Sequence, residues 1–156
     1  MKKLKINTIV IAFLVISFIG FLDATYLTVS HYRGTELNCT ILQGCEEVTN
    51  SAYSVIYGVP VALLGMGYYL VIMTLSLFLL EMVLSMVFLE THESKILKIL
   101  PYLTIFGFVA SIWFVYLQIF VIGEICEYCM LSATTSTLLF ILGIILLTKQ
   151  KHARKS

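Results

Sequence analysis

The sequence predicts an all-α membrane protein, folded as a four-transmembrane-helix bundle with both termini in the cytoplasm. Composition is the first reason: of 156 residues, 60% are hydrophobic and 12% are charged, which is too little polar surface to cover a soluble globule. The other reasons are four uncharged stretches and the sorting of basic residues between loops. A helical crossing takes roughly 20 apolar residues, so we expect one integral membrane domain over residues 1–156.

The uncharged stretches set the expected crossings, which lie at about residues 6–30, 59–80, 99–123 and 128–148. The first contains a single acid, Asp23. The second is expected to begin at Gly58-Val59-Pro60, because this triplet is typical of a turn followed by a helix start, where proline is tolerated. The stretches lack the alternation of apolar and polar residues that membrane barrels show. We therefore expect a helix in each.

The basic residues predict the orientation, because cytoplasmic loops are enriched in lysine and arginine. Four crossings place both termini and the loop near residues 90–98 on one face, and the loops at 31–58 and 123–127 on the other. Nine of the ten basic residues fall on the first face, and only Arg33 falls on the second. The first face is therefore predicted to be cytoplasmic. All four cysteines lie on the opposite, extracytoplasmic face.

The cysteines form two pairs in the sequence, Cys39 with Cys45 and Cys126 with Cys129. Structural disulfides are one interpretation, because disulfides persist outside the cytosol. A Cys-x-x-Cys loop is too short for its disulfide to stabilise much, however, and at a helix start this spacing favours a thiolate. A four-thiolate metal site is a weaker interpretation, because the spacing of the first pair is wide and no histidine lies close. We therefore expect no metal site.

Thiol–disulfide exchange explains both pairs. Exchange proceeds through mixed disulfides, so one pair can take electrons from a partner protein and pass them to the other. Where a helix bundle meets lipid, the accessible two-electron acceptor is a membrane quinone such as ubiquinone or menaquinone. The sequence has no nucleotide fingerprint and no haem-attachment motif, since Met130 follows Cys129. The alternatives are a small membrane scaffold or transporter subunit with structural disulfides, and a soft-metal carrier.

Several short motifs are spread from the first crossing to the fourth. They are Asp23-Ala24-Thr25-Tyr26-Leu27-Thr28, Cys39, Cys45, Val48, Ser51, Tyr53, Gly58-Val59-Pro60, Gly65 and Cys126-x-x-Cys129. Together they resemble bacterial members of the vitamin K epoxide reductase family. The serine six residues after Cys45 and the order of the two pairs are the most specific features. The analogous family typified by bacterial disulfide-bond protein B has the reverse order of pairs.

The resemblance implies a role for each cysteine. Cys39 would receive electrons from a thioredoxin-fold partner on the extracytoplasmic side, and Cys45 would pass them inward. Cys126 would exchange with Cys45, and Cys129 would face the quinone. Ser51 resembles the family's hydroxyl residue near the active cysteines, where it would hydrogen-bond the quinone or orient a thiolate. Taken alone, a serine at this position is more typical of a turn or a helix cap.

Two departures from the family refine these expectations. Many bacterial relatives carry a fused thioredoxin-like domain, but this sequence ends shortly after its last expected crossing, so we expect a separate partner protein. Animal members have a tyrosine four residues beyond the second cysteine of the Cys-x-x-Cys, where Ala133 stands here. This favours an ordinary respiratory quinone as substrate. We therefore expect a bacterial cell membrane protein that supports disulfide formation in secreted proteins.

Two sets of residues besides the cysteines invite a functional interpretation. Asp23 is an acid inside a crossing, which suggests either a proton route to reduced quinone or a buried hydrogen bond to another helix; the hydrogen bond is the interpretation we favour. Trp113, Phe114, Tyr116 and Phe120 lie in the external half of the third crossing. Aromatic residues there are more often lipid contacts or interfacial anchors. Tyr116 is the candidate for lining a quinone pocket.

Overall fold

The computed structural model describes residues 2–35, 37, 39, 44–84 and 90–155, with only the backbone for helical residues 2–6, 82–84, 90–97 and 150–155. Its elements are α1 (Lys2–Arg33), α2 (Cys45–Thr49), the 3₁₀ turn η1 (Ala52–Ser54), β1 (Val55–Ile56), β2 (Val59–Pro60), α3 (Val61–Leu84), α4 (Glu90–Tyr116), the π-helical segment η2 (Leu117–Ile122) and α5 (Glu127–Lys155). Among the described residues, four helical stretches are long and apolar enough to cross a membrane, at Asn7–Arg33, Val61–Glu81, Lys98–Ile122 and Glu127–Lys149. The predicted four-helix membrane bundle is therefore confirmed.

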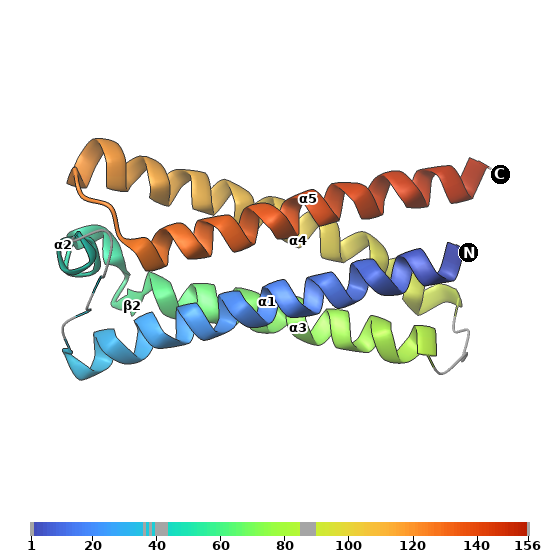
Figure 1. Ribbon diagram of the computed structural model, residues 1–156, viewed down its shortest axis with the longest axis horizontal. Coiled ribbons are helices and arrows are strands. Elements are labelled where there is room, and N and C mark those ends of the chain that lie inside the picture. Colours follow the sequence, from blue (N-terminus) through green and yellow to red (C-terminus); the bar gives the residue numbers. More distant parts are fainter. Residues whose placement is uncertain (1, 36, 38, 40–43, 85–89, 156) are drawn as a thin grey trace.

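The four long helices form an elongated bundle (Figure 1). α1 packs along α3, α4 packs along α5, and α1 also contacts α5, whereas contact between α3 and α4 is sparse. The start of α1 and the end of α5 lie at one end of the bundle. The other end, which we call the cysteine end, carries α2, the β1–β2 hairpin and the start of α5. Which end faces the cytoplasm stays a prediction.

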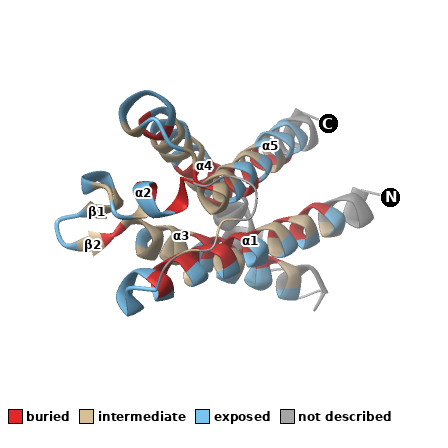
Figure 2. Ribbon diagram, turned by 60° about the vertical axis from the view of Figure 1, so that its left-hand side comes forward, coloured by how far each residue is buried: buried red, intermediate tan, exposed pale blue. Residues whose placement is uncertain are grey.

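The interior of the bundle is filled by large apolar side chains from all four helices. Phe13 of α1, Ile72 of α3, Leu100 of α4 and Leu139 of α5 have no exposed surface. Figure 2 shows the buried residues on the sides where the helices face one another. Large apolar side chains also point outward, and Phe106 is 72% exposed. An apolar exterior is what contact with lipid requires, so this exposure agrees with membrane-spanning helices.

Small residues and hydroxyl groups hold the helices together, as expected where lipid surrounds the bundle. A Cβ atom at Gly20 of α1 would overlap the ring of Tyr69, so α3 approaches α1 closely at this point. The Tyr69 hydroxyl forms hydrogen bonds with the carbonyl oxygen of Ser132 at 2.8 Å and with Thr135 Oγ1 at 2.7 Å. Tyr69 of α3 therefore contacts both α1 and α5.

The second crossing begins differently from the prediction. Val55 pairs with Pro60 and Ile56 with Val59 in an antiparallel hairpin. Tyr57 and Gly58 close this hairpin with φ values of 51° and 82°, as a two-residue hairpin turn requires. The prediction that Pro60 lies in the first helical turn is wrong, because Pro60 ends a strand and α3 starts at Val61.

Candidate functional site

Cys39 and Cys45, which we call the outer pair, form a disulfide with their Cα atoms 6.1 Å apart. Cys45 is buried at the start of α2, and Cys39 is half-buried. The residue before Cys45 is Gly44, where a Cβ atom would lie only 2.8 Å from Glu124 Cβ and from the backbone nitrogen of Ile125. Because glycine has no Cβ, the start of α2 packs directly against the segment that leads to Cys126.

Cys126 and Cys129, which we call the inner pair, are free thiols at the start of α5. Gly123 ends η2 in the left-handed region, with φ 79°, and so allows the chain to turn back toward the bundle. The Cys126 carbonyl oxygen then accepts a hydrogen bond from the Met130 N–H at 3.0 Å. The Cys126 N–H donates to Gln118 Oε1, also at 3.0 Å. The Cys126 backbone is therefore held from both sides.

The surroundings of Cys126 favour its thiolate. A hydrogen bond from the Cys129 side chain lowers the pKa of Cys126, and hydrogen bonds from the backbone of Cys129 and Tyr128 act in the same direction. Burial and the nearby Glu127 carboxylate raise the pKa but do not outweigh these bonds, so the result is about 7 instead of the ordinary 9.0. A helix start is known to favour a thiolate in this way. Reduced Cys126 is therefore a nucleophile near neutral pH.

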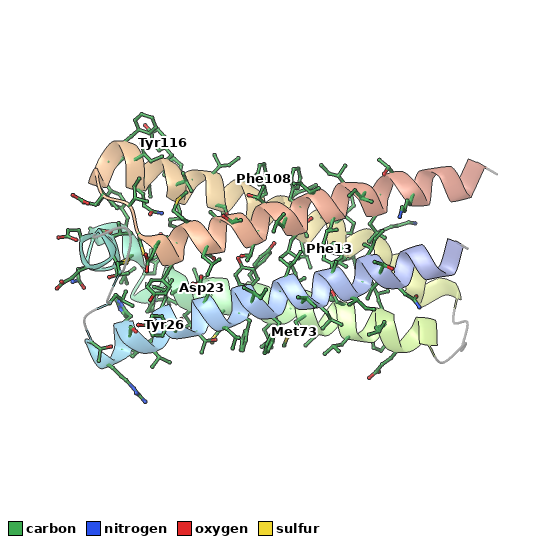
Figure 3. All side chains as sticks on the ribbon, in the orientation of Figure 1. Phe13, Asp23, Tyr26, Met73, Phe108 and Tyr116 are labelled. Carbon is green, nitrogen blue, oxygen red and sulfur yellow. A yellow bond between two sulfur atoms is a disulfide. The ribbon has the colours of Figure 1, made fainter. Side chains whose placement is uncertain are left out.

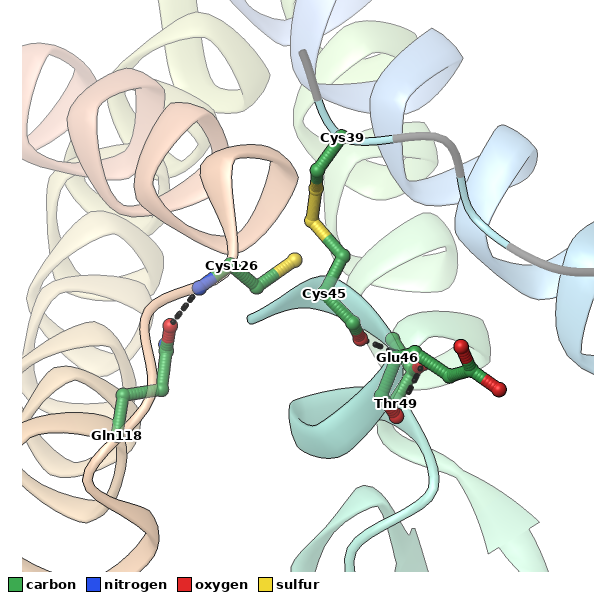
Figure 4. The surroundings of a disulfide bond; sticks show 6 residues. All are labelled: Cys39, Cys45, Glu46, Thr49, Gln118 and Cys126. Atoms are coloured by element: carbon green, nitrogen blue, oxygen red, sulfur yellow. Dashed lines mark hydrogen bonds between the residues drawn. A yellow bond between two sulfur atoms is a disulfide. The ribbon is translucent and has the colours of Figure 1, made fainter. Parts of the chain in front are cut away.

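The sulfur atoms of the outer pair lie next to Cys126. The Sγ atoms of Cys39, Cys45 and Cys126 are all within 4.8 Å of one another. Figure 4 shows the Cys126 side chain directed toward the disulfide. Because exchange begins when a thiolate attacks a disulfide sulfur, this arrangement is suited to exchange between the pairs. The structure thus brings three of the four predicted cysteine sulfurs within reach of one another, and Cys129 packs against the same cluster.

Cys129, the fourth predicted cysteine, lines a cavity of about 620 Å³. The cavity is mainly apolar, and its lining includes Ser51, Tyr68, Trp113, Gln118, Cys129 and Ala133. Ser51 donates a hydrogen bond from Oγ to the Val48 carbonyl oxygen at 2.7 Å. The buried Tyr68 hydroxyl has no hydrogen-bond partner among the residues that the structure describes. An apolar cavity with a few polar groups is typical of a small-molecule site.

Tyr116, which we predicted to line a quinone pocket, is not among the residues that line this cavity. Its side chain is 48% exposed, and its ring centroid lies 6.0 Å from that of Trp113 and 5.1 Å from that of Phe120. Figure 3 shows Tyr116 on the outer side of the bundle. The prediction used the depth of the residue in the crossing, whereas the rotation of the helix decides which face it occupies. Tyr116 is therefore placed on the lipid-facing surface.

Gln118 is a residue of the site that the sequence analysis missed. It is 3% exposed, lines the cavity and accepts the hydrogen bond from the Cys126 N–H. It lies in η2, where Leu117 is buried beside it. A π-helical turn holds one more residue than an α-helical turn and is frequent at functional sites. The available signal was a single amide side chain in an apolar crossing.

Two comparisons with known proteins find sequences similar to this chain. The sequence model of the vitamin K epoxide reductase family matches residues 11–144 of the chain. The curated thiol-disulfide oxidoreductase LTO1 of Arabidopsis thaliana is 35% identical over 130 residues, which cover 79% of this chain and 32% of that protein. The chain therefore spans about a third of the length of this relative.

Proposed function

Because the chain belongs to the vitamin K epoxide reductase family, we propose that it is a membrane thiol:quinone oxidoreductase. It would take electrons from a separate thioredoxin-fold partner and pass them through the two cysteine pairs to a membrane quinone, in support of disulfide formation. The observation that carries this proposal is the 4.8 Å cluster of the outer-pair sulfurs with Cys126, next to a cavity that Cys129 lines.

The outer pair would act first. A thiolate of the partner attacks Cys39 Sγ, the Cys39–Cys45 bond breaks, and Cys45 leaves as a thiolate. The partner's second thiol then attacks the mixed disulfide and releases Cys39, so the partner is oxidised and the outer pair is reduced. Cys39 suits this role because it is only half-buried, whereas Cys45 is 1% exposed.

The inner pair would receive the electrons next. The Cys45 thiolate attacks Cys126 of an oxidised inner pair and releases Cys129, and Cys39 then attacks Cys45 and releases Cys126 as a thiolate. The outer disulfide is restored and the inner pair is reduced. This is the pairing in the structure, with Cys39 bonded to Cys45 and both inner thiols free. It corresponds to the stage just before quinone reduction.

The cavity has the properties that a quinone headgroup needs. Its lining is mostly apolar, which suits a flat ring with a hydrocarbon tail. The unpartnered Tyr68 hydroxyl and the Gln118 amide can each donate a hydrogen bond to a quinone carbonyl oxygen. The sparse contact between α3 and α4, which both contribute to the lining, suits entry from lipid. The distribution of basic residues supports an extracytoplasmic position for this end.

The test is quinone reduction by the purified protein in lipid nanodiscs, with a small dithiol as electron donor and a short-chain quinone. Turnover is expected in the wild type and should fall to background in Cys126→Ala and Cys129→Ala. Trp113 is the one tryptophan of the chain and lines the cavity, so quenching of its fluorescence measures quinone binding separately. Full turnover without the inner pair would refute the proposal.

The partner step is tested by trapping. In Cys45→Ala, Cys39 has no intramolecular partner to displace a bound protein, so a mixed disulfide with the donor should accumulate at Cys39. Non-reducing gels and mass spectrometry of the cross-linked peptide identify the cysteine. A cross-link found only at Cys126 would contradict the order of the pairs.

The soft-metal carrier is the alternative with one observation in its favour, since three sulfur atoms lie within metal-binding reach of one another. Two of these are joined in a disulfide, and sulfur binds metal as a thiolate, so the carrier needs the outer pair reduced. Stoichiometric zinc or copper(I) retained by the reduced protein, and lost when either pair is replaced, would favour it. A structural scaffold instead predicts disulfides that quinone does not affect.

A further inference from the structure

Asp23 is a buried carboxyl group that the electron path described above does not use. It is 7% exposed and lies in the membrane-crossing part of α1. Neither of its carboxyl oxygens has a hydrogen-bond partner among the residues that the structure describes. The buried hydrogen bond that we favoured from the sequence is thus not found in the described part of the chain.

Two contacts fix the position of Asp23. Asp23 lies three residues after Gly20 and three residues before Tyr26 on α1, so it neighbours both on the helix surface. On one side of Asp23, Gly20 packs against the ring of Tyr69 from α3. On the other side, the ring centroid of Tyr26 lies 5.1 Å from that of Tyr128 in the first turn of α5. Figure 3 shows Asp23 on the inner side of α1.

This face of α1 therefore meets the turn of α5 that contains the inner pair. The Tyr69 hydroxyl donates a hydrogen bond to the Ser132 carbonyl oxygen, and Cys129 lies between Tyr128 and Ser132 in the sequence. Asp23 interacts electrostatically with Cys126, with Cys129 and with Tyr69. These are the titratable groups that face Asp23 from the start of α5 and from α3.

Oxidation of the inner pair requires a proton to move inside this apolar region. The Cys129 side chain donates a hydrogen bond to Cys126, so in the reduced pair Cys126 is the thiolate and Cys129 keeps its proton. When the Cys126–Cys129 bond forms, the Cys129 proton must leave. Cys129 is only partly exposed and lines a mainly apolar cavity, so it has little contact with water that could take the proton. A carboxyl group next to Cys129 can do so.

We propose that Asp23 carries this proton, exchanging it between the Cys129 thiol and the reduced quinone. The inference rests on the proposed function, which supplies the quinone as oxidant. Asp23 holds a proton in the resting protein, because an unpaired carboxylate is costly in an apolar interior. Tyr69 faces Asp23 and also lines the cavity, so the proton would pass from Asp23 toward the cavity on the side of Tyr69.

Two electrons leave the inner sulfurs for the quinone, and the Cys126–Cys129 bond forms. Asp23 gives its proton to the reduced quinone and takes the Cys129 proton in its place. The second proton of the quinol comes from solution and matches the negative charge that the Cys126 thiolate loses. Asp23 is therefore unchanged at the end of the cycle.

The first experiment needs no quinone. Infrared difference spectra between the dithiol-reduced and the disulfide form of the inner pair should contain a carboxylic acid carbonyl band, because the charge next to Asp23 changes. This band should be missing in Asp23→Asn and shifted in Asp23→Glu. A wild-type spectrum without any carboxylic acid band would overturn the proposal. The infrared result does not depend on quinone reduction. Failure of the wild type to reduce quinone would refute the proposed function instead.

The second experiment follows the oxidation of the reduced inner pair by a short-chain quinone in stopped flow. Asp23→Asn should be slower by about 10²-fold, the usual contribution of a positioned proton carrier, and Asp23→Glu should recover part of the rate. Above neutral pH, where Cys126 is a thiolate, the Asp23→Asn rate should fall further as pH rises, since its proton must come from solution. Exchange between a small dithiol and the outer pair should not change.

Ser76 provides the matched control. Its hydroxyl is also fully buried in a crossing without a hydrogen-bond partner among the described residues, but it lies on α3 away from the cysteine end. Ser76→Ala should keep the wild-type rate and pH dependence. If Asp23→Asn oxidises its inner pair as fast as the wild type, Asp23 carries no proton. If Asp23→Asn does not fold, the proposal is tested by the oxidation rate of Asp23→Glu and by the carboxylic acid band of the wild type.

Discussion

The two cysteine pairs differ in how the fold holds them. Cys129 lies in the first turn of a helix of 29 residues, and Cys126 directly precedes this helix. Backbone hydrogen bonds to Gln118 and from Met130 fix Cys126. Cys45 begins a helix of 5 residues, and the backbone N–H of Cys39 donates to the Leu37 carbonyl oxygen at 3.0 Å. Reduction of the outer disulfide removes the covalent link between Cys39 and α2, whereas reduction of the inner pair leaves the bonds of α5 in place.

This difference suits the two tasks that we propose for the pairs. A pair that exchanges with another protein must let its sulfurs change partners and position. A pair that meets a small molecule in a cavity profits from a fixed geometry and a tuned pKa. The low pKa of Cys126 and its two backbone bonds belong to the second kind. The following substitutions remove these features one at a time.

The largest effect is expected from Cys129→Ala on the acidity of Cys126. With the outer pair replaced by serines, the thiolate absorbance of the reduced protein should titrate at about pH 7. In Cys129→Ala the midpoint should move toward 9.0, because the main hydrogen bond to Cys126 is lost. The thiolate fraction at neutral pH then falls about tenfold for each unit of this change.

The same shift predicts a pH dependence of stability. The pKa of Cys126 is lowered by folding, so its contribution is complete above the ordinary value of 9.0 and is lost as pH falls through about 7. The reduced protein should therefore lose thermal stability over this window, and Cys129→Ala should lose less. An unchanged thiolate midpoint in Cys129→Ala would show that the Cys129 hydrogen bond does not tune Cys126.

A smaller effect is expected from Gln118→Met, which keeps the approximate size of the side chain but removes the acceptor for the Cys126 N–H. Leaving a buried N–H unsatisfied costs about 1–3 kcal/mol, and exchange between Cys126 and the outer pair should slow about tenfold. Rapid-quench alkylation measures the exchange. Gln118→Glu keeps an oxygen at the same position and serves as the comparison. Equal rates for Gln118→Met and the wild type would remove Gln118 from the site.

The smallest effect is expected from Gly44→Ala. The added methyl group would meet Glu124 and the backbone of Ile125, so α2 must shift away from the inner pair, at about 1–3 kcal/mol. Exchange between the pairs should slow several-fold while quinone binding, followed through Trp113 fluorescence, stays unchanged. Gly67→Ala is the control, since nothing lies within 4 Å of its added Cβ. Equal exchange rates in both variants would show that close packing at Gly44 is unimportant.

The sequence predicts the bundle well because the bilayer imposes a simple rule. Each crossing needs an uninterrupted apolar stretch of sufficient length, and the four helical stretches of the structure correspond to four such stretches. The β1–β2 hairpin at Tyr57 and Gly58 escapes this rule, because its pairing depends on neighbours and not on hydrophobicity. The π-helical segment at Leu117–Ile122 escapes it as well.

The sequence predicts the chemistry of the site, but it does not predict which face of each helix points into the site. Even crossing numbers place both cysteine pairs at one end, and the structure has them there. Tyr116 was placed by depth and lies on the outside, because helix rotation depends on packing. Asp23 was noticed as an acid in a crossing, yet only the fold shows that its carboxyl group lacks a hydrogen-bond partner in the described residues and faces the inner pair.

The sparse contact between α3 and α4 has a kinetic consequence. A reactant that enters the cavity between these helices arrives by lateral diffusion in two dimensions, so its effective concentration is its mole fraction among the lipids. Diluting the protein-containing membranes with buffer leaves this fraction unchanged, whereas adding empty lipid lowers it. Turnover should therefore follow surface dilution, and the total amount of acceptor per millilitre should not describe the rate.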